Sequence, residues 1–375
     1  MRIAIIAHLK HAIREPFAGG LETHTHMLAS SLRDRGHDVT LFASAHSDPT
    51  LGIEAICDET SLLATGTDEA NDVAFFREHH AYLRLMNELR SRAFDVIHNN
   101  SLHYLPVSMA DAVPTPMVTT LHTPPFCWLE SGVRLCPPAS MRFIAVSSAT
   151  ARQWAHVASV DRIIRNGIDL SDFAYRDRPD AAHYLVWHGR IVPEKGLEYA
   201  IDAARSAGLP LRFAGPISDP GYYAREIAPR LGDDARYVGH LDHRALAALV
   251  GGAVAALCTP RWEEPFGLVV AEALACGTPV AAFARGGIPE ILDETCGVLA
   301  RPDDSAALAE AAIAASRLSR RAVRHHAERT CDIGCMVDSY ERLYRDVVAE
   351  RAARRIEVPA FAASDDQPVL RDAAA

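Results

Sequence analysis

Residues 253–283 read AVAALCTPRWEEPFGLVVAEALACGTPVAAF and predict a strand, a loop, a helix and a second strand in succession. The apolar runs 253–258 and 280–283 are short and bounded by Thr, Pro and Gly residues, as buried strands are. A strand, a helix and a strand in this order form a right-handed crossover in a parallel sheet. The segment therefore predicts an α/β fold.

The same alternation of apolar runs and helical segments extends across the chain. In the first half the expected strands are 3–7, 39–43, 95–98, 117–121 and 143–146, with a helix at 20–35. In the second half they are 184–187, 211–214, 253–258 and 280–283, with a helix at 196–207. Two such series predict two doubly wound, Rossmann-like domains, each built on a parallel sheet.

A polar segment at 166–180, with turn signals at Asn166-Gly167 and Arg178-Pro179, separates the two series. We therefore expect an N-terminal domain at 1–166 and a C-terminal domain at 181–333. A last helix is expected at 334–352. The end of the chain, 358–375, contains proline, small residues and two adjacent aspartates and is expected to be disordered.

Length and composition agree with a globular protein of two domains. The chain has 375 residues, and domains have roughly 100–200 residues. Hydrophobic residues make up 49% and charged residues 23%, values that exclude a disordered chain or a disulfide scaffold. The net charge of −10 repels phosphate backbones, so we expect no nucleic-acid partner. A phosphate ligand would therefore need a local group of positive side chains that overcomes the repulsion from the negative net charge.

Several features favour a cytoplasmic protein. The start MRIAIIAHLK is too short and too soon interrupted by Lys10 to resemble a signal peptide. No run reaches the about 20 apolar residues of a membrane-spanning helix, although peripheral membrane contact stays open. The eight cysteines form no CxxC pair, which favours buried free thiols over disulfides or zinc.

Ligands of parallel sheets bind beyond the carboxyl ends of the strands, so the residues that follow each strand are candidates. Gly19 and Gly20 lie where the first helix is expected to begin. Two glycines there would let a phosphate approach the backbone closely, or they would serve only to form a tight turn. His8, His98 and His122 each follow an expected strand end. Their long spacing disfavours zinc, which leaves structural hydrogen bonding or a functional role, the latter strongest for His122.

The loop 188–196 places Arg190 and Lys195 between an expected strand and an expected helix. Cations near a helix N-terminus oppose the helix dipole. A bound polyanion would reverse that penalty, whereas simple solvation of two surface cations is the alternative.

Glu264 and Glu272 lie in the loop and helix of the opening segment. We expect Glu264 just before the helix and Glu272 about two turns inside it, on the buried face. A buried carboxylate needs hydrogen-bond donors, and ribose hydroxyls would serve. A helix-dipole interaction for Glu264 and an internal salt bridge for Glu272 are the alternatives.

With seven residues between them, Glu264 and Glu272 resemble the E-x7-E signature of retaining nucleotide-sugar glycosyltransferases, glycosyltransferase family 4 with the GT-B fold. The resemblance covers nearly the whole chain. The other matching motifs are Gly19-Gly20-Leu21-Glu22, Thr120-Leu121-His122-Thr123-Pro124, Asn166-Gly167-Ile168-Asp169, Gly189-Arg190, Lys195-Gly196, Tyr237-Val238-Gly239-His240 and GGIPE at 286–290. Arg261 is a departure, because a small polar residue is common at this position.

The resemblance implies two domains that face a central cleft and a role for each matching position. Arg190 and Lys195 would hold the donor diphosphate, which Gly19 and Gly20 would approach from the other domain. Glu272 would accept hydrogen bonds from the ribose, and Glu264 would contact the donor sugar. The amides around Phe266, Gly267 and Leu268 would complete the site, the region of Gly239 would hold the base, and His122 would lie near the reacting sugar.

The same resemblance implies a retaining hexose transfer with neither a metal nor a cofactor, since the two cations neutralise the leaving diphosphate. The donor is expected to be a UDP-hexose. A small-molecule or glycan acceptor is expected near 98–104 and 122–128. A nucleotide-sugar epimerase or a phosphorylase on the same fold is the main alternative. A nicotinamide oxidoreductase is disfavoured because GxGxxG is missing from the first strand-to-helix loop. A non-catalytic sugar-binding protein is disfavoured because the motif residues Arg190, Lys195, Glu264 and Glu272 are all present.

Overall fold

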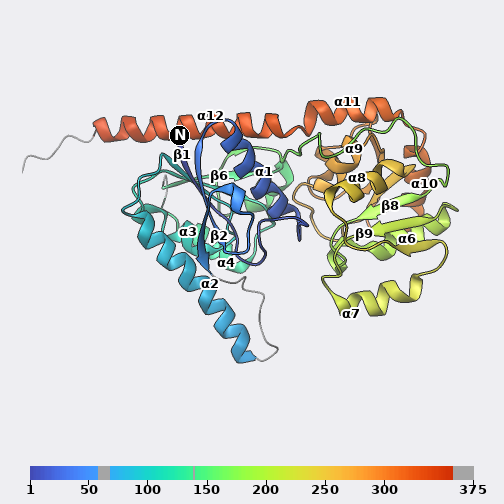
Figure 1. The fold of residues 1–375 in the computed structure, drawn as a ribbon, viewed down its shortest axis with the longest axis horizontal. Coiled ribbons are helices and arrows are strands. Elements are labelled where there is room, and N and C mark those ends of the chain that lie inside the picture. The colour runs from blue at the N-terminus through green and yellow to red at the C-terminus, as the bar shows by residue number, and fades with distance from the viewer. Residues whose placement is uncertain (58–67, 138–139, 358–375) are drawn as a thin grey trace, which may run out of the picture.

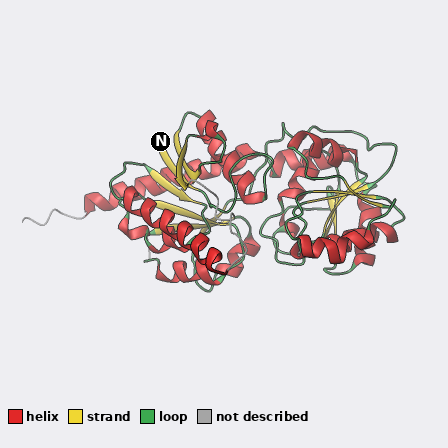
Figure 2. Cartoon of the chain, turned by 60° about the horizontal axis from the view of Figure 1, so that its bottom comes forward, coloured by secondary structure: helices red, strands yellow, loops and turns green. Residues whose placement is uncertain are grey.

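The computed structural model describes residues 1–57, 68–137 and 140–357. It contains two parallel β-sheets that lie side by side, each with helices packed around it (Figures 1 and 2). This arrangement confirms the α/β class with two doubly wound sheets. The expected disorder of 358–375 concerns residues outside the described part of the chain.

The N-terminal sheet has the strand order β3-β2-β1-β4-β5-β6-β7, and all of its pairings are parallel. Its strands are β1 (Arg2–Ile6), β2 (Asp38–Ser44), β3 (Ile53–Cys57), β4 (Val96–Asn99), β5 (Met117–Leu121), β6 (Met141–Ala145) and β7 (Val160–Ile163). Chain order reverses between β1 and β4, so the crevice at the topological switch point opens at their carboxyl ends.

The C-terminal sheet has the order β10-β9-β8-β11-β12-β13 and is also parallel. Its strands are β8 (Leu185–His188), β9 (Leu211–Ala214), β10 (Ala235–Tyr237), β11 (Ala255–Cys258), β12 (Val280–Phe283) and β13 (Gly297–Ala300). Here the switch point lies between β8 and β11. The loops that follow these two strands, together with the helix after β11, contain most of the site residues expected from the sequence.

Helices cover both sheets (Figure 2). Those of the N-terminal half are α1 (Gly20–Asp34), α2 (Asp68–Leu89), α3 (Tyr104–Ser108), α4 (Cys127–Leu135) and α5 (Ser148–Trp154). Those that follow are α6 (Leu197–Ser206), α7 (Pro220–Tyr222), α8 (His243–Gly252), α9 (Leu268–Ala275), α10 (Ser305–Ala315), α11 (Arg320–Thr330) and α12 (Ile333–Glu357). None of the helices in the described ranges is both long enough and apolar enough to cross a membrane.

The last helix, α12, leaves the C-terminal half and packs along the N-terminal sheet (Figure 1). Its buried residues recur at helical spacing, with Val337, Tyr340 and Tyr344 fully buried. Tyr344 shares a hydrogen bond of 2.7 Å with His98 of β4, and Tyr340 one of 3.0 Å with Thr120 of β5. The expected bounds 334–352 were too short, because the helix runs from Ile333 to Glu357.

The two connections between the halves lie side by side. The amide of Ile168 donates to the carbonyl of Cys331 (2.8 Å), and the amide of Ile333 donates to the carbonyl of Ile168 (3.0 Å). A second contact joins the halves through Glu290, whose carboxylate accepts from the amides of Ser148 and Ala149 at the start of α5. The sheets of the two halves lie within the boundaries 1–166 and 181–333, which stay our proposed domain division.

Candidate functional site

A cavity of about 420 Å³ lies between the two halves. Loops that follow β1, β5, β8, β9 and β11 contribute to its wall, so carboxyl ends of strands from both sheets meet there. Every site residue expected from the sequence lines this cavity except Gly239. The lining residues among them are Gly19, Gly20, His122, Arg190, Lys195, Glu264, Phe266, Gly267, Leu268 and Glu272.

Gly19 and Gly20 bring the N-terminal loop against the C-terminal half. A Cβ atom added to Gly20 would lie 2.9 Å from Leu268 Cδ1. A Cβ added to Gly19 would lie 3.6 Å from Arg190 Nε. The absence of side chains at these two positions therefore lets the first turn of α1 close over the loops that follow β8 and β11.

Lys195 and Glu264 form the central ion pair of the cavity. Lys195 Nζ lies 2.6 Å from Glu264 Oε2, and the indole Nε1 of Trp262 donates to the same oxygen at 2.8 Å. The ammonium also lies 5.3 Å from the centre of the Trp262 ring. Both ends of the pair are therefore held in place where they line the cavity.

Glu272 is the fifth residue of α9, which begins at Leu268, so it lies about one turn inside the helix and not the expected two. The carboxylate is buried and pairs with His188 Nε2 at 2.8 Å. His188 is the last residue of β8, so this contact joins the end of β8 to α9. An internal partner for Glu272 thus exists in the described structure.

Two cations of the cavity wall have no carboxylate partner within the described residues. Each lining carboxylate is paired: Glu22 with His8 (3.0 Å), Glu264 with Lys195 and Glu272 with His188. Burial is the largest influence on the pKa of Glu22 and raises it, but the hydrogen bond and charge of His8, a backbone hydrogen bond and the charge of His11 together hold that pKa below its ordinary value. Arg190 and Lys10 also line the cavity and form no ion pair within the described ranges. An anionic ligand would supply the missing countercharge.

The start of α9 adds hydrogen-bond donors to the same wall. Gly267 is the N-cap, with a φ of 107° that disfavours any side chain, and no side chain caps the helix. The first amides of a helix have no partner within it, and they point toward ligands in many anion sites. Leu268 and Val269, the first residues of α9, both line the cavity.

His122 follows β5 and is held by Asn100, with Nε2 placed 2.8 Å from the Asn100 side-chain oxygen. Burial and the neighbouring His24, His98 and His8 lower the pKa of His122 well below its ordinary value, so it is neutral near pH 7. The expectation that His98 shares the rim with His8 and His122 was wrong. His98 lies within β4, fully buried against Thr120 and Tyr344.

The far end of the cavity is formed by Gly215, Pro216 and His240. Gly239 does not line the cavity, but its carbonyl accepts from the amide of the lining residue Gly215 at 2.9 Å. Arg261, the departure from the family pattern, is turned away from the cavity and pairs with Glu198 at 3.2 Å. It therefore adds no charge to the cavity wall.

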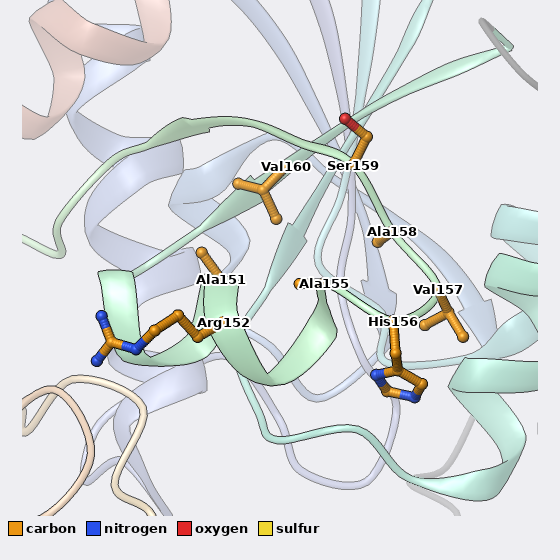
Figure 3. A pocket seen from close by; sticks show the side chains of 8 residues that line it. All are labelled: Ala151, Arg152, Ala155, His156, Val157, Ala158, Ser159 and Val160. Atoms are coloured by element: carbon orange, nitrogen blue, oxygen red, sulfur yellow. The ribbon is translucent and has the colours of Figure 1, made fainter.

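A second, shallower hollow of about 660 Å³ lies at the end of α5 (Figure 3). Its polar side chains, Arg152, His156 and Ser159, point in different directions, and the rest of its lining is small or apolar. It lies at the end of a helix and at the amino end of β7, away from the carboxyl ends of the strands. We assign no role to it.

Sequence reasoning missed several residues that the fold brings to the cavity. His188, Lys10 and Asn100 contact or line the site, yet none belongs to a motif with a distinctive spacing. The available signal was position, because His188 ends β8 and Asn100 directly follows β4. Trp262 stood inside the opening segment, but only the structure shows that its indole binds Glu264.

Comparisons with known proteins agree with this geometry. Residues 18–172 match the family described as Glycosyltransferase Family 4, and residues 172–329 match Glycosyl transferases group 1. A glycogen synthase of Mycobacterium tuberculosis is 29% identical over 78% of this chain and 81% of its own length. A D-inositol 3-phosphate glycosyltransferase of Mycolicibacterium paratuberculosis is 26% identical over 93% of this chain and 92% of its own.

Solved structures show the same fold. HepE of Anabaena, crystallised with UDP and glucose, superimposes with a TM-score of 0.72 at 19% identity, covering 92% of this chain and 100% of its own. WaaG, a glycosyltransferase of lipopolysaccharide biosynthesis, gives 0.68 at 16% identity, with 91% and 99% covered. The chain thus belongs to the GT-B glycosyltransferases of the family 4 type, and it is a glycosyltransferase enzyme.

Proposed function

We propose that the enzyme moves a hexose from a nucleoside-diphosphate sugar to an acceptor hydroxyl and retains the anomeric configuration. The observation that carries this proposal is that two cations of the cavity wall, Arg190 and Lys10, form no ion pair within the described ranges. A diphosphate is the anion that fits a cavity between two Rossmann-like halves. UDP is the proposed carrier, and the UDP complex of HepE supports this choice.

The roles of the side chains follow from their places on the wall. Arg190, Lys195 and the first amides of α9 would bind the diphosphate. Glu272 would exchange part of its contact with His188 for the ribose hydroxyls, and the wall at His240 would face the base. Glu264 would contact the hexose, with His122 opposite on the N-terminal half.

The transfer step needs positive charge more than it needs a nucleophile. As the bond between the sugar and the phosphate breaks, negative charge builds up on the diphosphate. Donors already fixed in place stabilise that charge without reorganisation. Because Lys195 is pinned by Glu264 and Trp262, it is oriented before the donor binds. We propose that no protein nucleophile, metal or cofactor takes part, and that the leaving phosphate accepts the proton of the attacking hydroxyl.

We propose that the acceptor, a small molecule or glycan, binds on the N-terminal half beside His122. His103, Tyr104 and Trp128 form a stack of rings in this half, with centroids 4.7 Å and 6.2 Å apart. Trp128 is 55% exposed although its ring also lies 5.3 Å from that of Phe75, so part of the indole is accessible to a sugar ring. The expected acceptor region around 98–104 and 122–128 contains this stack.

We also propose a cytoplasmic location. Free thiols suit a reducing compartment, and the chain has them at positions 127, 136, 258, 276, 296, 331 and 335.

A product assay tests the proposed function. The enzyme is incubated with UDP-, GDP- and ADP-hexoses and a panel of glycan and small-molecule acceptors, and released nucleoside diphosphate is measured. We expect release that requires an acceptor, and NMR of the product should show the anomeric configuration of the donor. An inverted product would refute retention, and a nucleotide sugar altered without acceptor would favour an epimerase.

A further inference from the structure

A second cluster of ligand-type side chains lies outside the donor cavity. Asp293, Cys296 and His326 each offer one ligand atom, and the three atoms lie within 4.8 Å of one another. Asp293 and Cys296 belong to the turn between β12 and β13, and His326 belongs to α11. None of the three lines the donor cavity.

The ring of His326 is oriented like that of a metal ligand. Its Nε2 lies 2.7 Å from the carbonyl oxygen of Ile291, so this nitrogen carries the proton and donates it. Histidines that bind metals commonly donate their other ring N–H to a carbonyl or carboxylate in this way. The lone pair of Nδ1 is then directed into the cluster.

The Nδ1 atom has no hydrogen-bond partner there. It is buried, in a side chain that is 7% exposed, and lies 3.1 Å from Asp293 Oδ2 without hydrogen-bond geometry. Two electron-rich atoms thus face each other at contact distance. A cation between them would remove the repulsion.

The other two side chains are also directed into the cluster. Asp293 Oδ1 accepts from the amide of Thr295 at 2.9 Å, which leaves Oδ2 to face His326. Cys296 Sγ is fully buried and lies 3.3 Å from the amide nitrogen of Asp293. The thiol in turn donates to the carbonyl of Asp293 at 3.5 Å, and a metal would take the place of this hydrogen, because cysteine binds metals as the thiolate.

Spacing in the chain agrees with these contacts. The residues form the pattern D-x2-C at 293–296 and H-x4-C at 326–331, within the range of ligand spacings in structural zinc sites. Cys331, at the end of α11, belongs to the same buried cluster as Cys296 and stands outside the group of three atoms. It or a water molecule would be the fourth ligand.

We propose that Asp293, Cys296 and His326 form a structural binding site for one divalent zinc ion. Binding converts the Cys296 thiol to a thiolate, forms one S–Zn bond and releases one proton to solvent, with no change of oxidation state. Nitrogen, sulfur and carboxylate ligands together favour zinc over magnesium or calcium. The ion would join the turn at 291–296 to α11 and takes no part in the proposed transfer.

The zinc site would also stabilise the contact between the two halves. Ile291, whose carbonyl orients His326, directly follows Glu290, which binds the start of α5. The preceding Gly287 donates its amide to the carbonyl of Glu264 at 2.7 Å. Fixing this turn would therefore fix the backbone that supports Glu264.

Metal uptake by the full-length protein tests the proposal. Zinc content is measured after purification, and Co²⁺ is then titrated into the chelator-treated protein. We expect about one equivalent of zinc and a thiolate-to-cobalt charge-transfer band. Asp293→Asn, Cys296→Ser and His326→Asn should each bind at least about tenfold more weakly, whereas Cys127→Ser, which changes an exposed cysteine of the other half, should bind like the wild type.

Thermal unfolding provides a second readout that does not depend on how well the buried variants fold. Asp293→Asn replaces a partly exposed side chain, so it should fold and yet lose the rise in Tm that zinc gives the wild type. The proposal is overturned if the wild type takes up no metal, if cobalt binds without the thiolate band, or if Asp293→Asn responds to zinc as the wild type does.

Discussion

Lys195 Nζ and Glu264 Oε2 lie 2.6 Å apart although 69 positions separate the two residues in the chain. Lys195 follows β8 and Glu264 follows β11, and these strands are neighbours at the point where strand order reverses. Side chains from both strand ends therefore meet in the crevice where α/β sheets bind their ligands. This pair links the sheet topology to the proposed chemistry.

Replacement of Lys195 by alanine should lower kcat by about 100-fold or more, because it removes one fixed donor to the leaving diphosphate. The measurement is the rate of nucleoside diphosphate release at saturating donor. Arg261→Ala serves as the matched control, since Arg261 is also a cation of this region but pairs with Glu198 outside the cavity. An unchanged kcat in Lys195→Ala would remove Lys195 from the transfer step.

Replacement of Glu272 by alanine should mainly raise the KM for the donor and change kcat less. The carboxylate is proposed to bind the ribose, which does not change during transfer. Loss of the carboxylate therefore weakens binding of the donor equally in the ground state and in the transition state. Titration calorimetry with the donor measures the effect. Equal donor affinity in the variant and in the wild type would show that Glu272 serves only as the partner of His188.

Glu290→Ala should loosen the contact between the two halves. The carboxylate accepts two amide hydrogen bonds at the start of α5, at 2.9 and 2.8 Å. A hydrogen bond to a charged group contributes about 1.5–3 kcal/mol to stability after desolvation is taken into account. We expect a larger radius of gyration in solution scattering and a higher donor KM. Glu310→Ala, on an exposed position of α10, is the control. Scattering curves identical to wild type would contradict this role.

Stability should fall as the pH is lowered from about 6.5 toward 4, because buried histidines of the N-terminal half resist protonation. Burial lowers the pKa of His24 to about 4 and that of His98 to about 3. The unfolded chain binds these protons near the ordinary pKa of histidine, whereas the folded protein binds them only at lower pH. The free energy of unfolding therefore keeps its full value above the ordinary pKa. Between the ordinary and the lowered pKa, it falls by up to about 1.4 kcal/mol per pH unit for each histidine.

His24→Leu tests this expectation. Neither ring nitrogen of His24 has a hydrogen-bond partner, so the variant should unfold with a free energy about 1 kcal/mol higher at neutral pH. The loss of stability between about pH 7.5 and about pH 5 should also be smaller than in the wild type. Urea denaturation at both values measures the difference, and an equal loss in both proteins would contradict the expectation.

The central strands were predictable from sequence, and the edge strands were not. The missed strands β3, β7, β10 and β13 are the four edges of the two sheets. Central strands of parallel sheets are covered on both faces and read as continuous apolar runs. An edge strand such as β7, with the sequence VDRI and mostly exposed side chains, carries no such run.

The loops of the site were predictable for a related reason, because Arg190, Lys195 and Glu264 all follow apolar strands. Their partners were not predictable. The contact of Glu272 with His188 depends on β8 and β11 being adjacent, and the burial of His98 depends on α12 crossing to the other sheet. Spacing within one segment does not encode such pairings.

Above all, we propose that the cavity binds a nucleoside diphosphate through Arg190 and Lys10, the cations of its wall that form no ion pair within the described ranges. Titration calorimetry of the full-length protein with UDP, GDP and ADP tests it most directly. Saturable binding of at least one of them is expected, with affinity lost in Arg190→Ala and kept in Arg261→Ala. Binding of none of the three, or equal affinity in Arg190→Ala and wild type, would contradict the account.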